Sequence, residues 1–349
     1  MKVFTKNPFL IADISLEFYD FAKKEQISNM ESAKILIDEA KYCGVDAVMF
    51  QAYKTENILT HDENAFEGLN SNYESYFDSL KKYDEFGVEE YCRLSEYCHE
   101  LGMFFLVNPL DFESADYLED FIDIYKISSS DITNIPFIKH VARKNKPIML
   151  TTGGSTLIEV QNAVKAIEDV STVDIVIMHS VLSHPTFYED ANLLMIKDLA
   201  QNFPDYEIGY SDHTQSDEDM MVLTTAYSFG ASVLEKHFTF DKKFKSENYC
   251  YSMDPDDVIK FKKNILFLSN IGGRKNKQPL ICESSIRKEY RKSIVAKVDI
   301  KKGSIIKESD IAFKRPGVGI PPFRADDVIG KEAIENISKD SLIYFENLK

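Results

Sequence analysis

The stretch KPIMLTTGGSTLIEVQNAVKAIEDVSTVDIVIMHS, residues 146–180, decides the fold. Two continuous apolar runs, IMLT and IVIM, flank a segment whose apolar residues recur at helical spacing. Continuous apolar runs are typical of parallel strands, because helices cover both faces of a parallel sheet. The stretch therefore predicts a strand, a helix and a second strand parallel to the first.

The same alternation extends in both directions along the chain. It begins with PFLIADI (8–14) and VDAVMFQAY (45–53) and ends with ASVLEKHFT (231–239) and a closing helix, which gives eight strand–helix units over residues 1–269. Eight such units favour a (β/α)8 TIM barrel. An open Rossmann-type sheet is the structural alternative, but no GxGxxG motif follows the first strand.

The pattern changes after the barrel. Residues 270–291 are polar and glycine-containing, and we interpret them as a linker with a short helix. Residues 292–349 contain short strand signals, turns and prolines, which predicts a small second domain. A domain of this size is marginally stable alone, so we expect it to dock on another surface.

Charge and cysteine usage limit the possible functions. The formal net charge is −16, from 57 acidic and 41 basic residues, so nucleic acid and anionic membranes are not expected partners. The five cysteines are scattered, no CxxC pair occurs, and no secretory signal is evident. We therefore expect reduced thiols and a cytoplasmic location.

In a TIM barrel the chemistry lies at the carboxyl ends of the strands. Four of the seven histidines fall there: His179, His184, His213 and His237. A lone histidine at a strand end is usually structural, but His213 and His237 end adjacent strands and can converge on one ion. Two histidines with open positions suit a divalent metal such as Mn²⁺ or Mg²⁺, acting as a Lewis acid on a carbonyl.

Hydroxyl side chains also gather at neighbouring strand ends. Ser129, Thr151 and Ser211, together with Lys126, could hold a phosphate through donated hydrogen bonds and one positive charge. Each hydroxyl alone is a weak signal, because a loop serine is usually a cap or turn residue.

The motifs together resemble a known family. FLIADI, VDAVMFQAYKTENI, NPLDFESADYL, YKISSSDITNIPFI, KPIMLTTGGST, GYSDHT and GASVLEKHFT are similar to the successive barrel motifs of bacterial sialic acid and legionaminate synthases. SIVAKVDIKKGSIIKESDI and KRPGVGI resemble the SAF (antifreeze-like) domain of these enzymes. The resemblance runs from about residue 8 to the end of the chain.

The resemblance implies a metal-dependent transferase of surface-carbohydrate biosynthesis. Such enzymes condense phosphoenolpyruvate with the open-chain aldehyde of an N-acetylated amino sugar, and release phosphate and a nine-carbon α-keto acid, a nonulosonic acid. Asp13, Lys126, His213 and His237 would be catalytic, the two histidines as metal ligands. Substrate-binding positions would be Gln51, Asn108, Ser129, Thr151, His184, Ser211, Asn248 and Arg315. Arg315 would act across a domain-swapped homodimer.

Several positions depart from the family pattern. The first strand ends in Asp13 where relatives carry glutamate, and LEFYDFAKKEQIS (16–28) replaces their Asn-His-Asn-Gly motif. The other departures are Met49 for lysine, Asn108 for threonine, Leu182 for asparagine, His184 for tyrosine and Asn248 for aspartate. We favour an active synthase with an altered acceptor. The alternatives are a non-catalytic sugar-binding or regulatory paralogue, and a metal-dependent aldolase or lyase that uses pyruvate.

Overall fold

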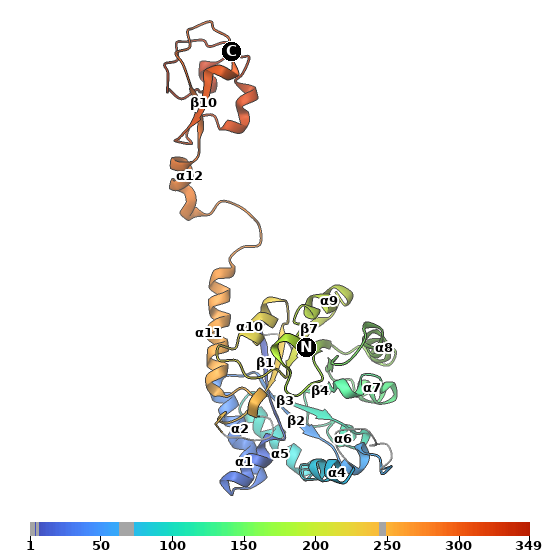
Figure 1. Ribbon diagram of the computed structural model, residues 1–349. Helices are drawn as coiled ribbons and strands as arrows, with labels where there is room; N and C mark the ends of the chain where they lie inside the picture. The colour runs from blue at the N-terminus through green and yellow to red at the C-terminus, as the bar shows by residue number, and fades with distance from the viewer. Residues whose placement is uncertain (1–3, 5–6, 63–72, 244–248) are drawn as a thin grey trace. The chain divides into compact units, whose positions relative to one another are not determined.

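The computed structural model describes all residues except 1–3, 5–6, 63–72 and 244–248. The chain divides into two compact units, Met1–Ile271 and Gly272–Lys349. In the described part of the larger unit, eight parallel strands close into a barrel in which each strand pairs with its neighbours in chain order. Helices surround these strands (Figure 1). The predicted (β/α)8 TIM barrel is therefore confirmed.

The elements follow one another in regular alternation. The barrel strands are β1 (Phe9–Ser15), β2 (Ala47–Ala52), β3 (Phe104–Pro109), β4 (Ile124–Ile127), β5 (Ile148–Thr151), β6 (Ile175–Ser180), β7 (Glu207–Asp212) and β8 (Val233–His237). The helices around them are α1 (Glu17–Glu25), α2 (Asn29–Cys43), α3 (Thr55–Ile58), α4 (Tyr73–Lys81), α5 (Val88–Glu100), α6 (Phe112–Tyr117), α7 (Ile135–Ala142), α8 (Leu157–Glu168), α9 (Met195–Asn202), α10 (Met221–Ser228) and α11 (Pro255–Gly272). Short 3-10 turns are η2 (Ser129–Asp131), η3 (Tyr188–Asp190) and η4 (Tyr249–Tyr251).

Local sequence signals set the helix ends. At the start of α8 the Thr156 hydroxyl accepts a hydrogen bond from the Glu159 N–H, and the Glu159 carboxylate accepts one from the Thr156 N–H. This reciprocal capping satisfies backbone donors that the first helical turn leaves unpaired. Helix α2 ends at Gly44, whose φ of +85° is the left-handed conformation that glycine adopts without strain.

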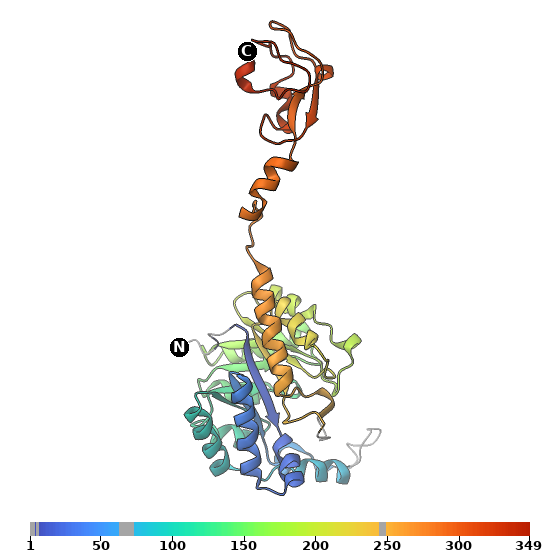
Figure 2. The same cartoon turned by 90° about the vertical axis from the view of Figure 1, so that its left-hand side faces the viewer.

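An additional helix follows the first barrel strand. Part of the inserted segment 16–28 forms helix α1, which buries Phe18 against Phe50 and Phe86. Figure 2 shows α11 running along the outside of the barrel near α2, where the Lys262 ammonium donates a hydrogen bond to the Gly44 carbonyl. Along the described chain, no helix has both the length and the apolar character needed to cross a bilayer.

The barrel interior begins with an apolar layer. Its members face one another across the strands and are fully or almost fully buried: Phe9, Ile11, Ala47, Met49, Leu106, Ile124, Met149, Val176, Met178 and Val233. Strand β7 contributes Gly209, because an added Cβ there would lie 3.0 Å from the Met178 Cγ and 2.8 Å from the Val233 carbonyl oxygen. The inward-facing residues nearer the carboxyl ends are polar, so this layer forms the floor of the barrel mouth.

The smaller unit has its own core. It contains α12 (Ser284–Tyr290), the antiparallel pair β9 (Ser293–Ala296) and β10 (Ile311–Lys314), and the 3-10 turns η5 (Ile281–Glu283), η6 (Glu308–Asp310), η7 (Pro322–Asp327) and η8 (Phe345–Asn347). Its buried side chains are Ile294, Ala296, Ile300, Ile306, Ile311, Ile320, Val328, Ala333, Ile337 and Ile343. The unit is therefore built largely from isoleucine, held between short strands and turns.

Candidate active site

A layer of polar residues lies above the apolar floor, one inward-facing position nearer the strand ends. Strand pairing makes its members neighbours: Asp13 pairs with His237, Gln51 with Asn108, Ser180 with Ser211, and Ser211 with Glu235. Lys126 and Thr151 complete the layer from β4 and β5. These side chains are buried or half-buried, and the two-residue repeat of a strand explains why they share one side of the barrel wall.

A buried ion pair outside this layer holds β7 against β8. The Lys236 Nζ lies 2.8 Å from Asp212 Oδ2, and both side chains are 1% exposed. Asp212 Oδ1 also accepts hydrogen bonds from the Tyr210 hydroxyl and from the N–H and hydroxyl of Thr214. The pair therefore fixes the chain directly beside His213 and His237, which face the barrel mouth.

His213 presents one ring nitrogen to the mouth. Its Nδ1 lies 3.1 Å from the Val181 carbonyl oxygen and 3.3 Å from the Ser180 hydroxyl. Donation from Nδ1 to the carbonyl leaves Nε2 with a free lone pair. Burial holds the pKa of His213 well below its usual value, and repulsion from His184 and His237 lowers it further. The ring is therefore neutral near pH 7 and able to bind a metal.

His237 lies beside Asp13, and its ring centroid is 5.7 Å from that of His213. Its Nε2 is 3.7 Å from Asp13 Oδ2, and burial lowers the pKa of the imidazole to about 3. Asp13 Oδ1 accepts a 2.5 Å hydrogen bond from the Ser15 hydroxyl. Burial raises the pKa of the Asp13 carboxyl, while the Lys126 charge and the Ser15 hydroxyl act against this shift. Asp13 is thus a carboxyl group that can hold a proton at a higher pH than usual.

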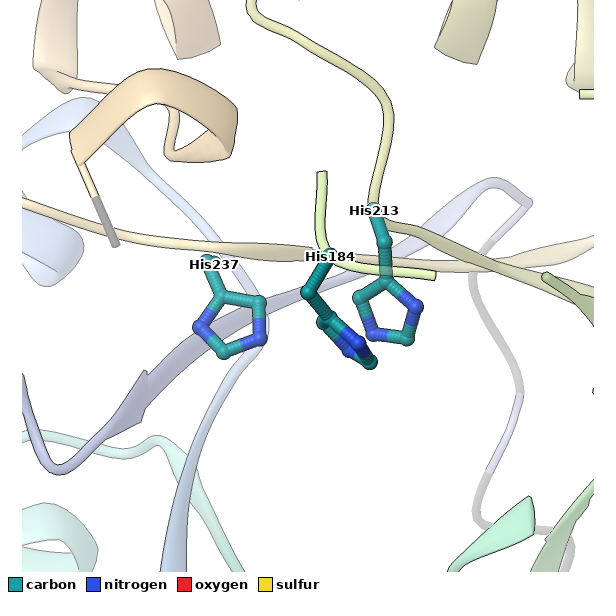
Figure 3. Close-up of side chains that lie close together, drawn as sticks. All are labelled: His184, His213 and His237. Atoms are coloured by element: carbon teal, nitrogen blue, oxygen red, sulfur yellow. The ribbon is translucent and has the colours of Figure 1, made fainter. Parts of the chain in front are cut away.

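His184 is brought to the same place by the loop after β6. Its ring centroid lies 3.9 Å from that of His213 and 6.4 Å from that of His237. Figure 3 shows the three rings side by side at the barrel mouth. One nitrogen from each of the three rings lies within 4.8 Å of the others, a spacing that one metal ion could bridge. His179 does not join them, because its Nε2 contacts the Ala191 carbonyl oxygen at 2.9 Å and its ring stacks on Tyr210.

Lys126, the lysine of the polar layer, forms an ion pair with Glu235. Lys126 Nζ lies 2.5 Å from Glu235 Oε1, which also accepts a 2.8 Å hydrogen bond from the Ser211 hydroxyl. Glu235 Oε2 is buried and has no hydrogen-bond partner among the described residues. An unpaired buried carboxylate oxygen is costly and marks a position where a ligand could donate a hydrogen bond.

The other predicted phosphate-binding hydroxyls are adjacent to one another but are already bonded. The Thr151 hydroxyl donates to the Ile127 carbonyl oxygen at 2.9 Å, and the Ser129 hydroxyl accepts from the Gly153 N–H at 2.9 Å. Gly153 has no room for a side chain, because an added Cβ would lie 2.9 Å from the Ser129 Oγ and 3.1 Å from the Leu182 nitrogen. Ser129 therefore retains a free proton to donate, whereas Thr151 and Ser211 would have to rotate.

Two amide side chains, Asn108 on β3 and Gln51 on β2, occupy paired positions in the polar layer. Asn108 is 2% exposed, and its Oδ1 has no partner among the residues that the structure describes. Gln51 is half-buried, and its backbone carbonyl accepts a hydrogen bond from the Tyr91 hydroxyl at 2.6 Å. Both amides are placed to bind a polar ligand in the mouth.

The remaining predicted residues lie elsewhere. Met49 belongs to the apolar floor below the polar layer. Asn248 falls in the segment 244–248, outside the described residues. Arg315 is exposed in the smaller unit, where its guanidinium lies 4.5 Å from the centre of the Tyr290 ring. Glu17, in the segment 16–28 that departs from the family pattern, accepts a hydrogen bond from the Thr239 hydroxyl at 2.8 Å.

Sequence reasoning missed two features of the site. Glu235 is not among the predicted site residues, although it lies two residues before His237 and so faces the same side of β8. His184 was assigned to the substrate rather than grouped with the other two histidines. The two-residue repeat could have identified Glu235, whereas the position of His184 depends on a loop whose path no periodicity predicts.

The closed barrel and the polar layer at the carboxyl ends of its strands define a (β/α)8-barrel enzyme. Residues 36–277 match the NeuB family, and residues 291–349 match the SAF domain. The chain is 36% identical over 321 residues to the uncharacterized protein MJ1065 of Methanocaldococcus jannaschii, which covers 92% of this chain and 90% of that protein.

A second relative is the N,N'-diacetyllegionaminic acid synthase of Legionella pneumophila, 32% identical over 328 residues, covering 92% of this chain and 91% of the relative. Among solved structures, a putative spore coat polysaccharide biosynthesis protein E from Chromobacterium violaceum matches with a TM-score of 0.78 at 23% identity, covering 98% and 99% of the two chains. That likeness supports the fold. The chain belongs to the NeuB family, a sialic acid synthase-like family of transferases, with a C-terminal SAF domain.

Proposed function

We propose that this enzyme condenses phosphoenolpyruvate with the open-chain aldehyde of an N-acetylated amino sugar to give a nonulosonic acid and phosphate. Relatives named as N,N'-diacetyllegionaminic acid synthases match it over nearly their whole length. The observation that carries the proposal is the convergence at the barrel mouth of the His213 and His237 imidazoles, the Asp13 carboxyl and the Lys126 ammonium. These groups suit the joining of an anionic enol ester to an aldehyde.

The bond changes define what the residues must do. C3 of phosphoenolpyruvate bonds to the aldehyde carbon, whose oxygen takes up a proton. Water adds at C2, and the C2–O bond to phosphate breaks, so that phosphate leaves and a carbonyl remains at C2. We assign the Asp13 carboxyl to proton transfer at the aldehyde oxygen, because it lies beside His237 at the mouth and burial raises its pKa above the usual value.

Lys126 would hold the anionic substrate. Its ammonium is 6% exposed and is paired with the Glu235 carboxylate. A phosphate or carboxylate oxygen of the substrate would bind the ammonium in place of Glu235 or together with it. The Ser129 hydroxyl retains a proton to donate to the same anion. A buried ammonium and an oriented hydroxyl bind anions more strongly than exposed groups do, because bulk water screens them less.

The mouth also fits a divalent metal ion. His213 Nε2 and the His237 ring are its ligands in this proposal, and the Val181 carbonyl fixes the His213 tautomer. When bound, the ion supplies Lewis-acid polarisation of the aldehyde oxygen. We propose Mn²⁺ or Mg²⁺ as the ion that supports turnover.

We further propose that the acceptor differs from that of sialic acid synthases. The Asn108 amide oxygen has no partner among the described residues, and Asn108 would contact the sugar together with Gln51 and His184. Because the five cysteines form no disulfide in the structure, we also propose that the enzyme works in the reducing cytoplasm.

A non-catalytic sugar-binding paralogue is the second candidate. It is favoured by the bonding of Lys126 to Glu235 and by the hydroxyl protons of Thr151 and Ser211, which the protein itself accepts. In such a paralogue the anion site would stay closed, and sugar would bind without release of phosphate.

One experiment separates the two candidates. Phosphate release from phosphoenolpyruvate is measured with Mn²⁺ across N-acetylated hexosamines and diacetamido-dideoxy sugars. We expect release with one acceptor, abolished by a chelator and by His213→Ala, and unaffected by His140→Ala, whose imidazole is paired with Asp116 outside the mouth. Sugar binding by calorimetry without phosphate release from any acceptor would overturn the synthase proposal in favour of the paralogue.

We also propose that the enzyme is a domain-swapped homodimer in which Arg315 acts in the barrel of a partner subunit. Its exposed guanidinium is consistent with this role. The test mixes an inactive His213→Ala chain with an inactive Arg315→Ala chain. Recovery of phosphate release in the mixture supports action across the dimer, and a mixture without activity, from chains shown to exchange subunits, contradicts it.

A further inference from the structure

The three imidazoles at the barrel mouth form a compact cluster. They come from the loop after β6, the end of β7 and the end of β8, and their ring centroids are separated by 3.9, 5.7 and 6.4 Å. One nitrogen from each ring lies within 4.8 Å of the others (Figure 3). The proposed function uses two of these rings as metal ligands, so the third needs its own explanation.

Backbone contacts to β7 hold His184 in this place. The Thr186 N–H donates to the His213 carbonyl oxygen at 2.8 Å, and the Gln215 N–H donates to the Thr186 carbonyl oxygen at 3.2 Å. The Thr186 hydroxyl closes the loop by donating to the Ser183 carbonyl oxygen at 2.7 Å. His184 therefore lies two residues before Thr186, whose N–H is bonded to the backbone of His213. This bond fixes the position of His184 opposite His213.

The ring nitrogens of His184 have no hydrogen-bond partner within the described chain. His99, His140 and His179 each have a ring nitrogen within 2.9 Å of a protein oxygen. The His184 ring instead contacts the rings of His213 and Tyr251. The His184 side chain is exposed, so water can reach its ring nitrogens; what arranges the ring as a ligand is that one of its nitrogens lies within 4.8 Å of a nitrogen of each of the other two imidazoles.

We propose that His184 is a third ligand of the metal ion, so that the site is a three-histidine site open on the side of the mouth. This inference rests on the metal-dependent reaction proposed above. Three imidazole nitrogens on one side of an ion leave the other side to substrate oxygens, as in sites that activate small molecules at an open position. The loop after β6 thus belongs to the metal site as well as to the wall of the substrate site.

A third imidazole changes which ions the site holds best. Imidazole nitrogen suits Zn²⁺, Co²⁺, Ni²⁺ and Fe²⁺, whereas Mg²⁺ prefers oxygen ligands and keeps several of its waters. Each added nitrogen therefore strengthens binding of the later first-row ions more than that of Mg²⁺. We expect removal of His184 to narrow the difference in affinity between Co²⁺ and Mg²⁺.

The test measures Co²⁺ binding by the chelator-treated chain in the absence of both substrates. Calorimetry gives the affinity, and visible absorption reports the number and type of ligands. We expect His184→Ala and His184→Asn to weaken Co²⁺ binding on the order of 10- to 100-fold and to change the absorption spectrum. The matched control, His140→Ala, should bind Co²⁺ as the unmodified chain does, because His140 is paired with Asp116 on the barrel exterior.

The outcomes separate this inference from the proposed function. If His213→Ala loses Co²⁺ while His184→Ala keeps the affinity and spectrum of the unmodified chain, the third ligand is refuted and the two-histidine site stands. If none of the His184, His213 and His237 variants weakens Co²⁺ binding, the metal site itself is refuted and the inference with it. Equal thermal unfolding of the metal-free chains shows that each variant is folded.

Discussion

The two sides of the barrel mouth are built differently. On the β6–β8 side, Lys236, Asp212 and Thr214 bond to one another, and the loop carrying His184 is tied to β7. On the β1–β3 side, Asn108 has a buried amide oxygen without a partner among the described residues. Bonds between neighbouring strands and loops thus fix the backbone that carries the histidines on the β6–β8 side, where Glu235 Oε2 is the buried oxygen left without a partner among the described residues. A side that must accept a ligand keeps hydrogen-bonding groups free.

The largest effect is expected from Lys236→Met. The change leaves the Asp212 charge buried without its partner, and breaking a buried ion pair in this way typically costs about 3–5 kcal/mol of unfolding free energy. Urea unfolding of the metal-free chain measures the loss. Lys165→Met, which removes an exposed pair with Asp169 on α8, is the control and should change stability little. A loss no greater than that of the control would show that the pair does not hold the β6–β8 side together.

The next largest effect is expected from Lys126→Met, on the rate of the reaction. The ammonium is the positive group proposed to hold the anion, and removing one oriented charged donor costs about 3 kcal/mol, roughly a hundredfold or more in kcat/KM for phosphoenolpyruvate. Steady-state phosphate release measures the change. Lys144→Met, which removes a lysine paired with Asp116 and Glu119 outside the mouth, should leave the rate unchanged. If Lys126→Met and Lys144→Met release phosphate at similar rates, Lys126 does not bind the anion in the reaction.

The third expectation concerns pH and His237. Its pKa is about 3 in the folded chain and about 6.5 when unfolded, so below pH 6.5 only the unfolded chain takes up the proton. The stability of the metal-free protein should therefore fall as the pH drops from about 6.5, by up to about 1.4 kcal/mol per pH unit from this group. His237→Gln should flatten the dependence of unfolding free energy on pH between 7.5 and 5. An unchanged slope would mean that His237 titrates normally in the fold.

The smallest effect is expected from Asn108→Leu. This substitution should stabilise the fold, whereas Lys236→Met should destabilise it. Replacing a buried amide that lacks a partner with an apolar side chain of similar volume should raise the unfolding free energy by about 1 kcal/mol. The same change should weaken binding of the sugar acceptor and raise its KM. Thermal unfolding and acceptor kinetics measure the two effects. A loss of stability would show that Asn108 is a structural residue and that the β1–β3 side is bonded after all.

The sequence predicted the parts of the structure that depend on periodicity. Continuous apolar runs that alternate with helical segments identified the strands of the barrel. The two-residue repeat of a strand then places Ser211 and Glu235 on the inner wall. The sequence could not show that Lys126 bonds to Glu235, because the two residues are 109 positions apart and meet across the barrel. Nor could it show that His179 turns outward to Ala191 while His184 turns inward, because that depends on packing and on a loop.

The apolar floor beneath the polar layer has a consequence for how such enzymes diversify. Met49, Met149 and Met178 fill the barrel with flexible, uncharged side chains, so the layer above rests on a surface that does not depend on which polar residues stand on it. A polar residue of the layer can therefore be exchanged without rebuilding the hydrophobic centre, and Met49 extends that centre at the position where the resembled family carries lysine. The apolar floor and the polar layer are therefore separate parts of the same strands, one inward-facing position apart.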